Sequence, residues 1–109
     1  MSEVKIEVDH HKLMYHPERV AEWKEKGDCF PVYVEIGLTN RCNHHCEFCA
    51  LDLWVGKERK DLEKDILLRN IHDMAEHGVK SIMFAGEGEP LLHQDLSLFV
   101  QTAKKSGID

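Results

Sequence analysis

The cysteines of this chain give the first indication of its chemistry. Three of the four, Cys42, Cys46 and Cys49, fall within a stretch of eight residues, while Cys29 lies well upstream. A disulfide framework spreads its cysteines across the fold to join distant segments, so a tight triplet argues against one. In a reducing compartment, such a triplet indicates metal binding or catalysis.

The spacing of the triplet predicts a metal centre with one open coordination position. Cubane iron–sulfur clusters are normally held by four cysteine thiolates. Intervals of three and two residues let one loop direct three sulfurs at three irons, which leaves the fourth iron free for a substrate or cofactor. A structural zinc site is the main alternative, with His44, His45 or Cys29 as fourth ligand. We interpret the two histidines as exposed loop residues and Cys29 as a lone thiol.

The elements that must position this loop follow from hydrophobic periodicity and turn signals. Within 1–15, Val4, Ile6 and Val8 alternate with charged residues, which suggests a short edge strand. Further along the chain, the patterns predict helices over 17–26, 62–77 and 95–106 and strands over 32–38 and 81–85.

Each predicted helix has an expected start or apolar face. Asp61 is a good N-cap for the helix over 62–77. The two tryptophans, Trp23 and Trp54, are expected to pack against other apolar side chains. The apolar faces of the second and third helices comprise Leu62, Ile66, Ile71, Met74 and Ala75 in one and Leu96, Phe99, Val100 and Ala103 in the other.

The order of these elements predicts a βαβ unit followed by one more helix. Two strands joined in this way are parallel, so both end at the same edge of the sheet. The cysteine loop follows the first strand, and the loop over 86–90 follows the second. Parallel sheets bind ligands at this carboxyl edge. We therefore expect the two loops to face one pocket.

Both loops match motifs of a known family. The pattern Cys42-x3-Cys46-x2-Cys49, with Phe48 before the last cysteine, resembles the signature of radical S-adenosylmethionine (SAM) enzymes, which also place it after the first strand. The second loop resembles the Gly-Gly-Glu-Pro motif of the same family. Its residues here are Gly86, Glu87, Gly88, Glu89 and Pro90, so a glutamate, Glu87, stands at the first glycine of the motif.

The resemblance implies a cofactor set and a reaction. The three cysteines would hold a 4Fe-4S cluster, and the amino and carboxylate groups of SAM would chelate the open iron. Phe48 would contact the adenine, and the second loop would bind the methionyl amino group, with Glu89 as the acceptor. Transfer of one electron to the sulfonium would give methionine and a 5′-deoxyadenosyl radical, which takes a hydrogen atom from the substrate.

The resemblance also implies a fold and partners. The fold class is α/β, and the chain supplies the N-terminal β/α units of a partial (β/α)6 TIM-like barrel that we expect to be truncated. We divide it into an N-terminal extension, 1–31, and the first two β/α units, 32–109. The stretch 11–28 resembles extensions of members that act on peptides or carbohydrate-related metabolites, which suggests a peptide or small metabolite as substrate. A reductant protein such as a flavodoxin or ferredoxin would supply the electron.

A truncated barrel leaves sheet edges unpaired, which favours self-association. It also gives a second functional hypothesis, in which the chain binds the cluster and SAM without turnover.

The position of Glu35 in the barrel follows from the alternation of strand residues between the two faces of a sheet. Tyr33, Glu35 and Gly37 would face the barrel interior, opposite Val32, Val34, Ile36 and Leu38 on the helix side. Glu35 then either lines the active-site cavity or pairs with a basic residue on another strand.

Composition limits the remaining classes. The formal net charge is -6, so a nucleic acid is not an expected partner. No apolar stretch is long enough to span a membrane, and the first residues lack the apolar core of a signal peptide. We therefore expect a cytoplasmic protein, in which thiols stay reduced.

Overall fold

The computed structural model describes residues 10–50 and 58–109. The predicted edge strand at Val4, Ile6 and Val8, and the predicted packing role of Trp54, lie outside these residues. The elements are, in order, the short 3-10 helix η1 (Leu13–Tyr15), α1 (Pro17–Lys26), β1 (Tyr33–Ile36), α2 (Lys64–Glu76), β2 (Ser81–Phe84), the 3-10 helix η3 (Pro90–Leu92) and α3 (Leu96–Lys105).

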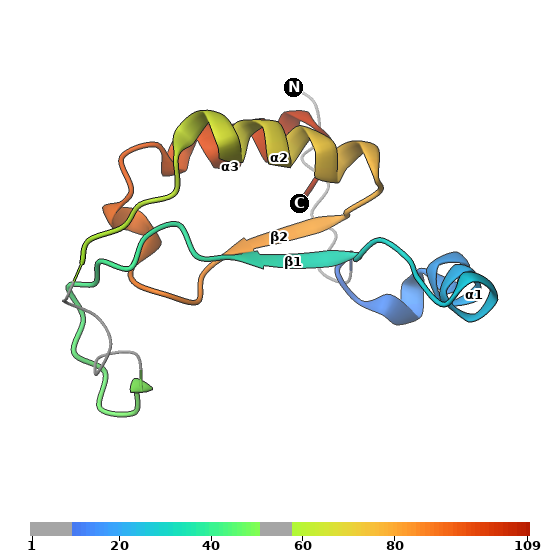
Figure 1. Cartoon of the computed structure of the whole chain (residues 1–109), viewed down its shortest axis with the longest axis horizontal. Coiled ribbons are helices and arrows are strands. Elements are labelled where there is room, and N and C mark those ends of the chain that lie inside the picture. Colours follow the sequence, from blue (N-terminus) through green and yellow to red (C-terminus); the bar gives the residue numbers. More distant parts are fainter. Residues whose placement is uncertain (1–9, 51–57) are drawn as a thin grey trace, which may run out of the picture.

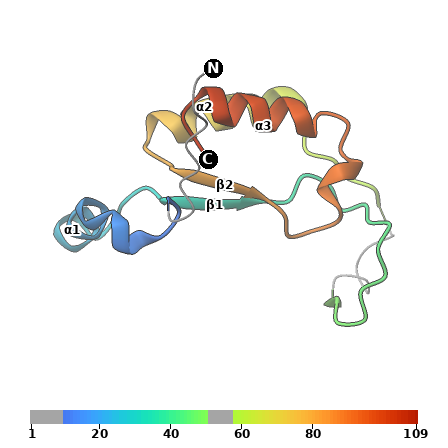
Figure 2. The same ribbon diagram turned by 180° about the vertical axis from the view of Figure 1, so that it is seen from behind.

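The two strands form a parallel pair, as the order of elements predicts. Tyr33 pairs with Ser81 and Ile36 with Phe84, so both strands run in register to the same edge. Helices α2 and α3 lie together over one face of this sheet, and both views show the opposite face without a helix (Figures 1 and 2). The structure is thus a mixed α/β arrangement, and the partial barrel stays a prediction.

The core lies between the sheet and the two helices. Each helix contributes two buried residues, Leu67 and Ile71 from α2 and Phe99 and Ala103 from α3. Leu38, just beyond β1, and Ile108, after α3, complete the buried cluster. The strand residues Ile36, Ile82 and Phe84 pack against it. The helix-facing role predicted for Ile36 and Leu38 is therefore confirmed.

Three residues assigned to the apolar helix faces are in fact exposed. Leu62 and Ile66 were expected on the inner face of the second helix, and Val100 on that of the third, but all three are exposed. Helix α2 begins only at Lys64, so Leu62 precedes it, and its backbone N–H donates to the carbonyl oxygen of Leu38 at 2.8 Å. The buried stripe passes through Leu67, which the sequence pattern missed.

Asp61 does not cap α2, contrary to the prediction. The N-cap position is Glu63, which makes no side-chain capping hydrogen bond. The Asp61 carboxylate instead accepts hydrogen bonds from Thr39 and Arg41 on the far side of the cysteine loop. The stronger, charge-assisted partners therefore determine where this carboxylate lies.

Helix α1 lies at the end of β1 opposite to the cysteine loop (Figure 1). Pro17 begins it and Gly27, in the left-handed conformation with φ 74°, ends it, as predicted. Arg19 attaches it by donating to the carbonyl oxygens of Phe30 at 2.6 Å and Gly78 at 2.9 Å. Trp23 is 57% exposed, so the prediction that it is a packing residue is wrong.

The last residues of the chain pair with the free edge of β2. The Asp109 N–H donates to the Lys80 carbonyl oxygen at 2.9 Å, and the Ile82 N–H donates to the Asp109 carbonyl oxygen at 2.8 Å. This alternation between two residues flanking Ser81 is the pattern of a parallel bridge. Asp109 therefore lies against the edge of β2 that β1 leaves free. Among the described residues, no helix has the length and apolar character needed to cross a membrane.

Candidate functional site

Two loops leave the sheet at the same edge, as predicted. The loop that carries the cysteines follows β1, and the loop over 86–89, which leads into η3, follows β2 (Figure 1). The parallel register brings both to one side of the molecule although about forty residues separate them in sequence.

The second loop lies directly against the start of the cysteine loop. Gly88 adopts a positive φ of 64°, and a Cβ atom there would collide with the carbonyl oxygens of Thr39 and Arg41. The Glu89 N–H donates to the Arg41 carbonyl oxygen at 2.8 Å. Glycine is thus required at this position by both conformation and space. The two loops form a junction in which the backbone of 88–89 rests on that of 39–41.

Glu87 stands where the family motif has its first glycine, and its backbone is not strained there. Among the described residues every positive φ belongs to a glycine, so Glu87 keeps an ordinary backbone conformation. Its backbone nitrogen and Cβ lie near Gly37, at the carboxyl end of β1. The positive φ angles of the loop fall at Gly86 and Gly88 instead.

The two ends of the cysteine loop are held together at its base. Thr39 and Asp61 form an isolated antiparallel bridge, and the Thr39 hydroxyl donates to Asp61 Oδ1 at 2.5 Å. Asn40 adds two reciprocal contacts, because its amide donates to the Glu58 carbonyl oxygen and its Oδ1 accepts from the Lys60 N–H. The described residues on either side of the loop are therefore joined like the two strands of a hairpin.

Arg41 connects this base to the second loop. Its Nε and one terminal nitrogen donate to the two carboxylate oxygens of Asp61 at 3.1 and 2.7 Å. The same terminal nitrogen donates to the Leu92 carbonyl oxygen at 3.0 Å. Arg41 was not among the predicted site residues, and Asp61 was predicted only as an N-cap. The sequence signal for their contact is opposite charge at the two ends of the loop, twenty residues apart.

The ionic contact changes the titration of Asp61. Hydrogen bonds from Arg41, and then from Thr39, hold the pKa of the Asp61 carboxyl below its ordinary value of 3.8. The nearby His93 is buried at the same junction, where its Nε2 lies 3.0 Å from the Leu62 carbonyl oxygen. The base of the loop thus combines a charged pair with a buried polar side chain.

The three cysteines lie beyond this base as free thiols. Cys42 and Cys46 are exposed, and Cys49 is half-buried. The Cys49 N–H donates to the Cys46 carbonyl oxygen at 3.0 Å, so these two residues share a tight turn. Across residues 10–50 and 58–109, no three histidine, cysteine or acidic side chains are gathered closely enough to hold a metal ion. The three candidate ligands are free thiols in one loop, and cysteine thiolates are the usual ligands of an iron–sulfur cluster.

Two neighbours of the cysteines differ in their contacts. His44 Nε2 lies 3.2 Å from Glu89 Oε2, which joins the cysteine loop to the second loop by side chains as well as backbone. Glu89 Oε1 also accepts from the Leu91 N–H at 3.0 Å and caps η3. Phe48, the predicted adenine contact, is 92% exposed. His44 and His45 are exposed loop residues, as predicted.

Glu35 lies on the face of the sheet that the helices leave uncovered. It is exposed, pairs in register with the exposed Met83, and accepts a hydrogen bond from the Tyr33 hydroxyl at 2.8 Å. Desolvation and the neighbouring carboxylate raise the pKa of the Tyr33 hydroxyl above 10.0. No barrel interior surrounds Glu35 in the described residues, so its role in a cavity stays a prediction.

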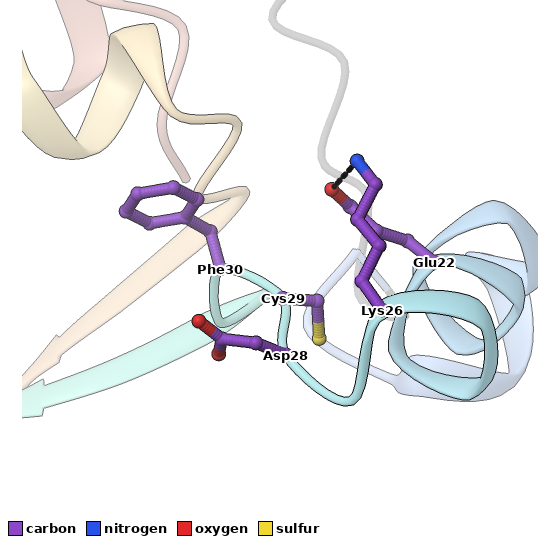
Figure 3. A pocket seen from close by; sticks show the side chains of 5 residues that line it. All are labelled: Glu22, Lys26, Asp28, Cys29 and Phe30. Carbon is purple, nitrogen blue, oxygen red and sulfur yellow. Dashed lines mark hydrogen bonds and ion pairs between the residues drawn. The ribbon is translucent and has the colours of Figure 1, made fainter.

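Cys29 lies apart from the triplet. It precedes β1, whereas the other cysteines follow it, and it lines a shallow hollow of about 320 Å³ with Glu22, Lys26, Asp28 and Phe30 (Figure 3). Two of its lining residues, Glu22 and Lys26, belong to α1, which lies at the opposite end of β1 from the cysteine loop (Figure 1). Cys29 is a free thiol, and this separation removes it as the fourth ligand of a zinc site.

Comparison with known proteins identifies the class. Residues 36–109 match the model of the radical SAM superfamily, and the chain belongs to this superfamily. The matched range begins in β1 and contains both loops. No solved structure matches the chain significantly.

Among curated proteins, similar relatives carry several different names. The chain is 34% identical to the tungsten-containing aldehyde ferredoxin oxidoreductase cofactor-modifying protein of Pyrococcus furiosus, over 69% of this chain and 21% of the relative. It is 35% identical to the GTP 3′,8-cyclase of Tolumonas auensis, over 71% and 23%. It is 31% identical to the PqqA peptide cyclase of Bradyrhizobium diazoefficiens, over 72% and 20%. The chain therefore spans only about a fifth to a quarter of these relatives.

Proposed function

We propose that this chain forms the cluster- and SAM-binding part of a radical SAM enzyme. The observation that carries the proposal is the junction of the two loops, in which Gly88 and Glu89 rest on the residue that immediately precedes Cys42. This places the motif expected to bind the amino group of SAM beside the first of the three cysteines. Membership in the superfamily supports the same assignment.

In this proposal each residue has a defined task. Cys42, Cys46 and Cys49 hold a 4Fe-4S cluster by three thiolates, and Glu89 accepts from the methionyl amino group with Gly86, Glu87, Gly88 and Pro90 shaping the loop. Phe48 covers the adenine. When bound, the reduced cluster would supply the one electron that cleaves SAM to methionine and a 5′-deoxyadenosyl radical, and this radical would take a hydrogen atom from the substrate. The protein's part is to position these groups and exclude water.

The three thiols suit a 4Fe-4S cluster better than they suit a structural zinc ion. Structural zinc requires four closed ligands, and the separation of Cys29 leaves only His44 or His45 to complete the triplet. His44 is engaged with Glu89. Three thiols in one short loop instead suit a centre that keeps one metal position open for a small molecule.

The rest of the enzyme also belongs to the proposal. Membership in the superfamily supports a partial (β/α)6 barrel to which the parallel pair of strands belongs. We propose a cytoplasmic enzyme whose electron comes from a flavodoxin or ferredoxin. Its substrate would be a peptide or small metabolite, since the names of its relatives include both a peptide cyclase and a GTP cyclase. Self-association would cover the sheet if the barrel is incomplete.

The deciding experiment is anaerobic reconstitution with iron and sulfide, followed by reduction in the presence of SAM. We expect four irons and four sulfides per chain, and 5′-deoxyadenosine and methionine as products detected by mass spectrometry. Stoichiometric zinc without sulfide would contradict the proposal and support the alternative, a structural zinc site. A cluster that binds SAM but releases no 5′-deoxyadenosine would leave the second candidate, a binding part without turnover.

A further inference from the structure

We propose that Arg41 is a positioning residue that sets the distance between the cysteine triplet and the loop at Glu89. This inference rests on the proposed function, since it concerns how the two cofactor-binding loops are held relative to each other. It is carried by the contacts of the side chain and backbone of Arg41 with two separate segments, one at Asp61 and the other at 89–92. No motif of the sequence analysis includes this residue.

The contacts of Arg41 span the whole junction. Its guanidinium holds both carboxylate oxygens of Asp61, at the far end of the cysteine loop. A terminal nitrogen of the same group also donates to the Leu92 carbonyl oxygen, at the end of η3. Its own carbonyl oxygen accepts the Glu89 N–H. Thus one residue fixes the base of the first loop and both ends of the segment 89–92.

The geometry makes this position sensitive to small changes. Gly88 leaves no room for even a methyl group between the loops, so the backbone of the second loop cannot move closer. The guanidinium contacts prevent it from moving away. Cys42 is the next residue, so Arg41 also determines where the cysteine loop leaves the junction. Residues that orient ligands in this way typically contribute about 10–100-fold to metal affinity or activity.

Arginine is suited to this task in a way that lysine is not. A planar guanidinium can hold a carboxylate with two parallel donors and still direct a hydrogen to a third oxygen. An ammonium group at the end of a flexible stem keeps the charge but not this fixed fork. Arg41→Lys therefore separates the geometry of the contact from its charge, while Arg41→Gln removes both.

The test compares Arg41→Lys, Arg41→Gln and Asp61→Asn with Arg59→Gln in the reconstituted protein. Arg59 is exposed, lies near the same loop base and makes no hydrogen bond or ion pair with the described residues. We expect all four variants to keep wild-type iron and sulfide content. The dissociation constant for SAM should rise about tenfold or more in Arg41→Gln, less in Arg41→Lys, and not at all in Arg59→Gln.

Two further readouts distinguish positioning from general destabilisation. In the protein without cluster, amide hydrogen exchange over 86–92 should accelerate in the Arg41 and Asp61 variants while exchange in α2 and α3 stays unchanged. With the cluster, the effects of Arg41→Gln and Asp61→Asn on SAM affinity should be non-additive, because both act through one contact.

The outcomes are separable. If Arg41→Gln binds SAM as tightly as the wild type and the exchange over 86–92 is unchanged, Arg41 does not position the loop. The same conclusion holds if Arg41→Gln loses iron and exchanges faster throughout while Arg41→Lys behaves as the wild type in every assay. A wild-type protein that takes up no cluster or ignores SAM would overturn the proposed function, and the exchange measurement would still report whether Arg41 holds the junction.

Discussion

The base and the tip of the cysteine loop differ in how the protein holds them. At the base, Thr39 is buried and Asp61 is bound by two partners, so the two ends of the loop are fixed. At the tip, Cys46 and Phe48 are exposed, and the contact between Cys49 and Cys46 is a single backbone hydrogen bond. Contacts within the chain therefore fix the base of the loop. We expect the arrangement of the thiols at the tip to be fixed by the cofactor of the proposed function.

This difference is expected of a metal centre whose binding energy orders its own ligands. Metal affinity contributes to folding wherever the site is not preformed. In the proposed function, a well-held base would limit the entropy that the cluster must overcome, and an open tip would keep the metal accessible to SAM. Changes at the tip should therefore act directly on cofactor binding, and changes at the base should act on the stability of the junction and, through it, on SAM binding.

The largest effect is expected at the tip. Replacing Cys42, Cys46 or Cys49 singly with alanine should reduce the iron and sulfide content to background, because a cubane with only two thiolate ligands from the chain is not retained. Cys29→Ala provides the matched control, since this residue precedes β1 whereas the triplet follows it. Retention of a full cluster by any of the three variants would show that the triplet is not its ligand set.

The next largest effect is expected where the two loops touch. Gly88→Ala should lower the free energy of unfolding by about 2–5 kcal/mol, because it adds a collision to the cost of a positive φ. Gly86→Ala is the matched variant, with a φ of 113° but open space around its Cβ, and should cost only about 1–3 kcal/mol. Urea unfolding measures both. Equal losses would mean that the close approach at Gly88 does not matter.

A smaller, pH-dependent effect is expected at Asp61. Its lowered pKa means that the carboxylate stabilises the fold above about pH 4 and that this contribution disappears as the pH falls through the folded value. Asp61→Asn should therefore cost about 1 kcal/mol at neutral pH, a modest figure because the side chain is partly exposed, and little at low pH. Urea unfolding between pH 7 and pH 3 measures this.

The control for Asp61 is Asp73→Asn, which changes an exposed carboxylate on α2. Its difference from the wild type should stay small and constant over the same pH range. A constant difference for Asp61→Asn as well would show that the contact with Arg41 does not affect stability.

The smallest effect on stability is expected from Phe48→Ala. A side chain that is 92% exposed contributes little to the fold, so the free energy of unfolding should change by less than about 0.5 kcal/mol. If Phe48 covers the adenine, its loss should weaken SAM binding by roughly 2- to 13-fold, which corresponds to about 0.5–1.5 kcal/mol for an aromatic contact. Phe30→Ala, at the opposite end of β1, should leave SAM affinity unchanged. Unchanged affinity in Phe48→Ala would remove this residue from the site.

Much of the fold was predictable because its signals are local. A run of β-branched and aromatic residues marked the first strand and a short apolar run marked the second. Their order required a parallel pair, which the register of Tyr33 with Ser81 confirms. The errors arose where tertiary contacts outweighed local preference. Asp61 has the sequence of an N-cap, but Arg41 binds it more strongly than a backbone N–H would.

The site was predictable only in part, for a related physical reason. Cysteine spacing and the Gly-Glu-Gly-Glu-Pro sequence are short, contiguous patterns, and the parallel sheet then predicts that they meet. The contact of Arg41 with Asp61 and Leu92, and that of His44 with Glu89, join residues distant in sequence. No periodicity or spacing encodes such pairs, so they appear only once the chain is folded.

The central claim is that the three thiols hold a cluster whose open iron binds SAM beside Glu89. Pulsed electron paramagnetic resonance of the reduced, reconstituted protein with SAM labelled with nitrogen-15 at its amino group tests this directly. We expect a hyperfine coupling between the cluster and the labelled nitrogen. A 4Fe-4S signal that shows no such coupling at saturating SAM would contradict the account.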